Sequence, residues 1–158
     1  MNKPLSLEER QQLCAAAQEV AKRAYAPYSK FRVGAAIFAG DTIYTGVNVE
    51  NASYGLTLCA ERAAFAKAIS EGERDFRAIA IACIDATEIE QNIQEFMPCG
   101  ACRQWMVEFS QDAEVIICGT DRVFRVEALM PMAFQLKKYG FPVSGGKSHH
   151  KVTKPPRI

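Results

Sequence analysis

Histidine is almost absent from this sequence. Only two of the 158 residues are histidines, His149 and His150, and they stand side by side near the end of the chain. The surrounding stretch lacks a hydrophobic pattern, which makes both residues poor candidates for ligands in a built metal site. A metal centre inside the fold would therefore have to use other side chains.

Long apolar runs are also missing. No stretch reaches the roughly eighteen apolar residues that a membrane-spanning helix needs. The first residues, Met-Asn-Lys-Pro-Leu, contain neither the apolar core nor the cleavage site of a secretory signal. We therefore expect a cytoplasmic protein without a membrane partner, whose six cysteines are thiols or metal ligands rather than disulfides.

A large net charge is the third absence. The formal net charge is +1, but residues 144–158 hold four of the 19 basic residues and none of the 18 acidic ones. The remaining 15 basic and 18 acidic residues give the body of the chain a net charge of −3, which argues against nucleic acid as its partner. We expect one domain over residues 1–143, followed by a basic, disordered tail over 144–158.

Hydrophobic periodicity predicts helices that alternate with strands. Ser6 and Glu9 form a capping box before apolar residues at helical spacing, and Gly34 marks a close backbone approach in the first strand. Cys83 and Cys118 fall inside apolar strand patterns and are expected to be core residues, and Cys14, in the first helical pattern, a small core or surface hydrophobe. Helices are predicted over 7–24, 59–71, 100–110 and 129–139, and strands over 31–39, 42–49, 78–84, 115–118 and 123–126. This order predicts a three-layer α/β/α sandwich around a mixed five-stranded sheet.

Three cysteines stand where predicted helices begin. Cys99 and Cys102 lie three residues apart in Pro-Cys-Gly-Ala-Cys, and Cys59 opens an earlier helical pattern. A helix N-terminus stabilises a thiolate, and two such ends can point at one ion. Zinc suits three thiolates better than calcium or magnesium does, and a catalytic zinc keeps its fourth position open. The three cysteines are therefore candidate zinc ligands.

Charged residues next to these cysteines could take part in proton transfer and in tuning the metal. Glu61, in the first helical turn after Cys59, can lean back over the helix end and take a proton from water held at the metal. Arg62 and Arg103 can donate hydrogen bonds to the sulfur atoms and withdraw charge from the metal. The alternative is that the two arginines are surface residues without a metal role.

Two other interpretations of the cysteines remain open. Cys99 and Cys102 alone would match a thioredoxin-like redox pair. A purely structural zinc site would need a fourth ligand, which the sequence does not offer outside the core cysteines and the tail.

The chain resembles the cytidine deaminase family, in its small three-cysteine branch that acts on free nucleosides. The resemblance rests on Cys59-Ala-Glu with Pro98-Cys-Gly-Ala-Cys, a signature with a known zinc-dependent mechanism. It extends to Phe31-Arg-Val-Gly-Ala-Ala, Gly46-Val-Asn-Val-Glu-Asn-Ala-Ser-Tyr and Leu129-Met-Pro-Met-Ala-Phe, and covers roughly residues 5–140. Where the family usually has Leu-Leu-Pro this chain has Leu129-Met-Pro, an exchange that conserves volume.

The resemblance implies specific roles. Cys59, Cys99 and Cys102 would hold one zinc ion per subunit, and Glu61 would move protons from water to the ring nitrogen and the leaving amine. Other implied contacts are Asn48 and Glu50 with the ribose 3′-hydroxyl, Phe31 with the pyrimidine, the Ala60 backbone with the base, and Tyr54 and Phe134 from neighbouring subunits of a homotetramer.

The implied activity is deamination of cytidine and deoxycytidine in pyrimidine salvage. Rival interpretations are a blasticidin-type or nucleotide deaminase, a nucleic-acid editor and a zinc-binding module without activity. Asn48 and Glu50 suit a bare sugar rather than a nucleotide, and the acidic body offers no basic channel for a polynucleotide. Release of ammonia from cytidine would exclude the module without activity.

Overall fold

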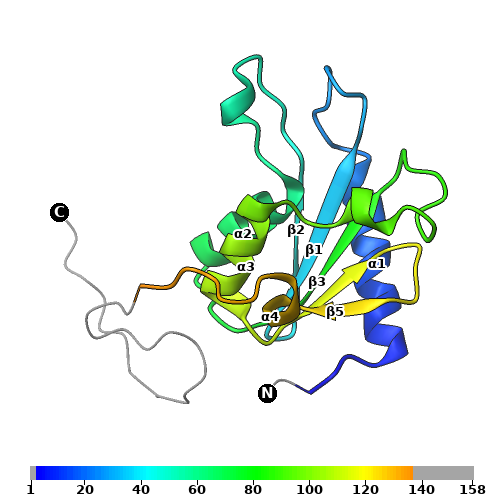
Figure 1. Ribbon diagram of the computed structural model, residues 1–158. Helices are drawn as coiled ribbons and strands as arrows, with labels where there is room; N and C mark the ends of the chain where they lie inside the picture. Colours follow the sequence, from blue (N-terminus) through cyan, green and yellow to red (C-terminus); the bar gives the residue numbers. More distant parts are fainter. Residues whose placement is uncertain (1–2, 137–158) are drawn as a thin grey trace.

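The computed structural model describes residues 3–136 and consists of a five-stranded sheet between two layers of helices (Figure 1). The main elements in chain order are α1 (Leu7–Ala21), β1 (Val33–Ala39), β2 (Thr42–Val47), α2 (Ala60–Ser70), β3 (Phe76–Cys83), α3 (Gly100–Ser110), β4 (Glu114–Ile117), β5 (Val123–Arg125) and α4 (Val126–Leu129). Two short 3-10 helices, η1 (Tyr54–Leu56) and η2 (Ile93–Phe96), lie in the loops that precede α2 and α3.

The strand order is β2-β1-β3-β4-β5, and the sheet is mixed. β1 pairs antiparallel with both β2 and β3, β3 and β4 run parallel, and β5 returns antiparallel to β4. The parallel pair needs a crossover, which α3 supplies. The predicted three-layer α/β/α sandwich with a mixed five-stranded sheet is confirmed.

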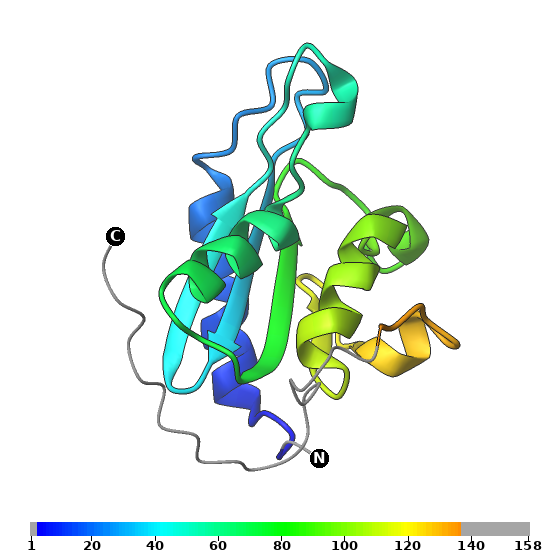
Figure 2. The same ribbon diagram turned by 90° about the vertical axis from the view of Figure 1, so that its left-hand side faces the viewer.

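Alternating side chains give the sheet two buried faces. Ala36 and Phe38 of β1 pack in one cluster with Leu13 and Ala17 of α1. Residues of the opposite parity, such as Ile37, pack in a second cluster with α2 and α3. Figure 2 shows α1 behind the sheet and α2 and α3 in front of it.

Two glycines let the helices lie directly on the β1–β2 hairpin. A Cβ atom at Gly34 would collide with the carbonyl oxygen of Ala17 in α1, and one at Gly46 with the backbone nitrogen of Ala64 in α2. The close approach that the sequence indicated at Gly34 is confirmed. Gly46 has the same function for the helix that carries Cys59 at its N-terminus.

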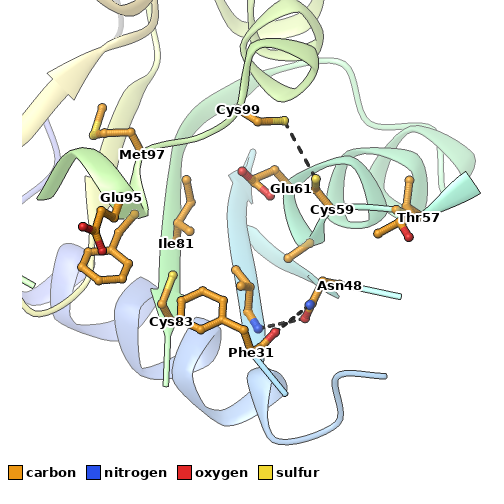
Figure 3. A pocket seen from close by; sticks show the side chains of 14 residues that line it. Phe31, Asn48, Thr57, Cys59, Glu61, Ile81, Cys83, Glu95, Met97 and Cys99 are labelled. Carbon is orange, nitrogen blue, oxygen red and sulfur yellow. Dashed lines mark hydrogen bonds between the residues drawn. The ribbon is translucent and has the colours of Figure 1, made fainter. Parts of the chain in front are cut away.

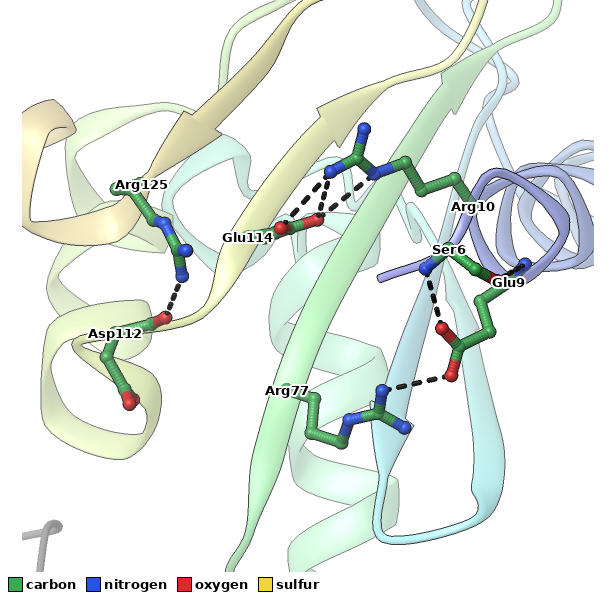
Figure 4. A network of polar contacts seen from close by, with 7 residues as sticks. All are labelled: Ser6, Glu9, Arg10, Arg77, Asp112, Glu114 and Arg125. Carbon is green, nitrogen blue, oxygen red and sulfur yellow. Dashed lines mark hydrogen bonds and ion pairs between the residues drawn. The ribbon is translucent and has the colours of Figure 1, made fainter. Parts of the chain in front are cut away.

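Charged side chains fasten α1 to strands β3 and β4 of the sheet (Figure 4). Buried Glu114 in β4 accepts two hydrogen bonds of 3.2 Å from the guanidinium of Arg10. Glu9 accepts from the backbone of Ser6 at 2.7 Å, which completes the predicted capping box, and from Arg77 at 2.9 Å. α1 is therefore oriented by directed contacts as well as by its apolar face.

The expectation that all cysteines are reduced was wrong, because Cys14 and Cys118 form a disulfide. Cys14 lies on α1 and Cys118 follows β4 directly, and their Cα atoms are 5.6 Å apart, within the usual range for a bridge. Apolar periodicity placed each cysteine against the core but carried no information on which residue it faces. Cys83 is a buried free thiol, as predicted.

The predicted helix over 129–139 was also wrong. α4 ends at Leu129, and residues 130–136 form a turn followed by irregular chain. A proline disfavours helical geometry in the residue before it, and Met130, before Pro131, has φ −145° and ψ 71°. Residues 137–139 and the predicted tail, with His149 and His150, lie outside the described residues.

Among residues 3–136 no helix is both long enough and apolar enough to cross a membrane.

Candidate metal centre and pocket

The three candidate ligands are positioned by two helix starts. Cys59 is the N-cap of α2, Cys99 is the N-cap of α3, and Cys102 follows in the first turn of α3. Their sulfur atoms all lie within 4.8 Å of one another, although Cys59 is forty residues from Cys99. The positive ends of two helix dipoles therefore meet at the thiol cluster.

The spacing of the sulfur atoms fits a zinc ion. Zinc–sulfur bonds of about 2.3 Å in tetrahedral geometry separate two ligand sulfurs by about 3.8 Å. The Cys59 and Cys99 sulfurs are 3.9 Å apart, and the Cys99 and Cys102 sulfurs 3.5 Å. Within the described part of the chain the group consists of three cysteines only, so one position of a tetrahedral ion is left for another ligand.

Hydrogen bonds prepare Cys59 to carry a negative charge. A contact with the Cys102 thiol, followed by one from Arg62, lowers the pKa of Cys59 to about 5. The Arg62 Nη2 atom lies 3.6 Å from the Cys59 sulfur and 3.1 Å from the carbonyl oxygen of Thr57. The hydrogen bond from Arg62 to a ligand sulfur, predicted from its place beside the cluster, is confirmed.

Arg103 donates no hydrogen bond to sulfur, which agrees with the interpretation that it has no metal role. Its Nε atom donates to the carbonyl oxygen of Pro98 at 2.8 Å, and its Nη1 atom to that of Leu129 at 2.9 Å. The side chain ties the start of the Cys99–Cys102 segment to the end of α4. Proximity in sequence could not distinguish this position from that of Arg62.

Glu61 is the buried carboxyl group beside the thiols. It lies in the first turn of α2 with 5% of its surface exposed, and Figure 3 shows its side chain next to Cys59 and Cys99. Burial raises the pKa of Glu61 to about 7. A carboxyl group with this pKa can accept and release a proton near neutral pH.

A pocket of about 200 Å³ opens in front of this cluster. The predicted residues Phe31, Asn48, Ala60 and Glu61 line it together with Cys59 and Cys99. Asn48 is held rigidly, because its Oδ1 atom accepts from the Val33 backbone and its Nδ2 atom donates to the carbonyl oxygen of Phe31, both at 2.8 Å. One polar amide therefore has a fixed orientation at the edge of the pocket.

Three predicted substrate contacts lie outside the pocket lining of this chain. Glu50 is half-buried and accepts hydrogen bonds from the Tyr28 backbone at 2.9 Å and from both the backbone and the hydroxyl of Ser29. Tyr54, in η1, is 89% exposed, and Phe134 is 68% exposed. A single chain does not bring Tyr54 or Phe134 to the pocket.

The sequence did not predict that the loop before α3 forms one wall of the pocket. Glu95, Phe96 and Met97 line the pocket at and just after η2, and the Phe96 ring stacks on Phe31 with centroids 6.3 Å apart. The adjacent pair Phe96-Met97, just before Pro98, is an apolar signal that could have indicated contact with the site. The polar residues before it made the segment look like an ordinary loop.

The sequence of this region matches a family profile. Residues 7–119 match the profile described as the cytidine and deoxycytidylate deaminase zinc-binding region. The chain belongs to the cytidine deaminase family. The match includes all three cysteines of the cluster and Glu61.

Individual family members cover most of the chain. A probable cytidine deaminase of Dictyostelium discoideum is 46% identical over 119 residues, which are 75% of this chain and 76% of that protein. A cytidine deaminase of Halalkalibacterium halodurans is 44% identical over 131 residues, 80% of this chain and 94% of that protein. The crystal structure of the cytidine deaminase from Burkholderia pseudomallei superposes with a TM-score of 0.69 and 43% identity, covering 78% of this chain and 98% of that one.

Proposed function

We propose that this chain is a zinc-dependent deaminase that converts cytidine and deoxycytidine, with water, to uridine and deoxyuridine and ammonia. The observation that carries the proposal is the cluster of three cysteine sulfurs at two helix starts with the buried Glu61 beside it in a pocket. Cys59, Cys99 and Cys102 hold one zinc ion per subunit. Zinc bound there lowers the pKa of water and so supplies a nucleophile at neutral pH.

Glu61 carries the protons of the reaction. The reaction forms a C4–O bond and breaks the C4–N bond to the amino group. Glu61 accepts a proton from the attacking water and delivers it to the ring nitrogen N3, then takes the second proton from the new C4 hydroxyl group and transfers it to the amine as it leaves. Its burial at the start of α2 keeps the carboxyl group in reach of this edge of the ring and limits competing water.

Neighbouring side chains position the nucleoside. Phe31 packs against the pyrimidine, the backbone of Ala60 contacts the O2/N3 edge of the base, and Asn48 and Glu50 bind the ribose 3′-hydroxyl. The fixed amide of Asn48 supports this assignment, because a preorganised group loses little entropy on binding. Arg62 stabilises the charge on the Cys59 sulfur.

The remaining residues act between subunits of a homotetramer. Tyr54 and Phe134 are exposed on the single chain, and each completes the pocket of a neighbouring subunit in this proposal. The enzyme acts in cytoplasmic pyrimidine salvage on free nucleosides rather than on nucleic acid.

Metal content and ammonia release test the function together. The purified full chain is expected to contain one zinc ion per chain and to release ammonia from cytidine and deoxycytidine. Blasticidin S is a suitable competing substrate, because a blasticidin-S deaminase of Bacillus cereus is 31% identical over 110 residues, 67% of this chain. Zinc-loaded protein that converts blasticidin S but not cytidine would overturn the proposal.

A further inference from the structure

Glu95 places a second carboxylate at the rim of the pocket, exposed to solvent and away from the thiol cluster. Its side chain lines the pocket from η2, and among residues 3–136 it has no hydrogen-bond or ion-pair partner. Glu61 is the other carboxylate in the lining, which contains no lysine, arginine or histidine. The negative potential of Glu95 is therefore not neutralised by a cation in the pocket wall.

The position of Glu95 relates it to one edge of the base. Figure 3 shows Glu95 and Met97 on one side of the pocket and Cys59, Thr57 and Asn48 on the other. In the proposed substrate orientation C4 of the pyrimidine faces the thiol cluster and N1 faces the sugar site at Asn48. Ala60 and Glu61 take the edge that carries O2 and N3, so the opposite edge, C5 and C6, faces the wall formed by Glu95, Phe96 and Met97.

The wall is held in place by its neighbours. The Phe96 ring is 8% exposed and stacks on Phe31 at an interplanar angle of 15°. The backbone N–H of Glu95 donates to the carbonyl oxygen of Asn92 at 2.9 Å. Glu95 therefore projects from an anchored turn at the rim of the pocket, on the side assigned to C5.

We propose that Glu95 is a specificity-determining residue for substituents on C5 of the pyrimidine. It disfavours anionic substituents and favours cationic ones, because the exposed carboxylate at the rim of the pocket repels like charge and attracts opposite charge. The inference rests on the proposed function, since the assignment of the edges of the base comes from it.

Competition experiments with the full-length, zinc-loaded protein measure this selectivity. The rate of uridine formation from cytidine is recorded with 5-carboxycytidine, which is anionic, or with neutral 5-methylcytidine as competitor. The change in the ratio of their two inhibition constants between wild type and variant reports the effect of charge, because any general loosening of the pocket affects both competitors. Cationic 5-aminomethylcytidine provides the opposite sign.

The charge of Glu95 should set this ratio. Because Glu95 is exposed, two like charges about 6 Å apart interact there through water, and Glu95→Gln should improve the relative binding of 5-carboxycytidine about threefold. Glu95→Lys should improve it further, both variants should weaken 5-aminomethylcytidine relative to 5-methylcytidine, and added salt should reduce the differences. Glu90→Gln is the matched control, because Glu90 lies in the same loop, pairs with Arg122 and does not line the pocket.

Each outcome has a definite meaning. A ratio that is the same in wild type, Glu95→Gln and Glu95→Lys overturns the inference, and so does an equal change in Glu90→Gln. Wild-type protein that forms no uridine from cytidine refutes the proposed function instead. Zinc content and far-ultraviolet circular dichroism confirm that every variant compared is folded.

Discussion

Breaking the Cys14–Cys118 disulfide should make the protein markedly less stable. The bond joins residues 104 positions apart and so restricts most of the unfolded chain. On the chain-entropy relation, closing a loop of this length raises the free energy of unfolding by about 4.7 kcal/mol at 25 °C. For a chain of this size that corresponds to a fall in Tm of about 10–20 °C on reduction.

Cys14→Ser is the suitable variant for this test. Cys14 is partly exposed, whereas Cys118 is 3% exposed, and a serine there would bury a hydroxyl group and add a desolvation cost of its own. α1 keeps its capping box and the Arg10–Glu114 contact in the variant, so the helix should still form. The variant should therefore report the loss of the cross-link rather than the loss of α1.

Urea denaturation with and without a phosphine reductant measures the effect. Oxidised wild type should be more stable than Cys14→Ser, and the reductant should destabilise wild type but leave Cys14→Ser unchanged, which controls for any action of the reductant on the zinc thiolates. Denatured, metal-free wild type should show four reactive thiols of the six cysteines. Six reactive thiols in oxidised protein, or a difference below about 1 kcal/mol, would refute the reasoning.

Three further predictions concern the site and its support. Glu61→Gln should keep one zinc per chain but lower kcat by about 10² to 10⁴-fold, because it removes the proton acceptor and no metal ligand; substantial activity would mean that another group is the base. Gly46→Ala should destabilise the protein by about 1–3 kcal/mol in urea denaturation, because its Cβ would meet the α2 backbone, whereas Gly55→Ala, with open space around it, should not; equal effects would contradict the close packing. Mixing Glu61→Gln chains with Phe134→Ala chains should give more activity than the two separate enzymes together, and no gain after confirmed subunit exchange would place Phe134 in its own subunit.

Much of the fold could be predicted because local signals agreed with the tertiary packing. The capping box at Ser6 fixed the start of α1, and the continuous burial of β1 follows from the helix layers on both faces of the sheet. The prediction of the last helix failed because the apolar residues after Leu129 have helical spacing, whereas Pro131 prevents Met130 from continuing the helix. The backbone geometry of Met130 therefore outweighed the helical spacing of the apolar residues that follow it.

The metal centre could be predicted because its ligands carry a strong spacing signal at helix starts. The pairing of Cys14 with Cys118 could not, since it depends on how α1 lies across β4. The contribution of Glu95 and Phe96 to the pocket could not be predicted for a similar reason, because only the course of the loop from β3 to α3 brings them there. Arg62 and Arg103 had equivalent positions beside cysteines in the sequence, and the three-dimensional structure separates one sulfur contact from two carbonyl contacts.

The two carbonyl contacts of Arg103 connect the metal centre to the last segment that the structure describes. One guanidinium holds Pro98, the residue before a zinc ligand, and Leu129, the residue from which the chain continues toward Phe134. If Phe134 binds in a neighbouring subunit, as proposed, then metal binding and subunit association act on the same rigid connection. Linkage requires any such coupling to be reciprocal: if removing zinc weakens the oligomer, dilution to single subunits should weaken zinc binding by the same factor.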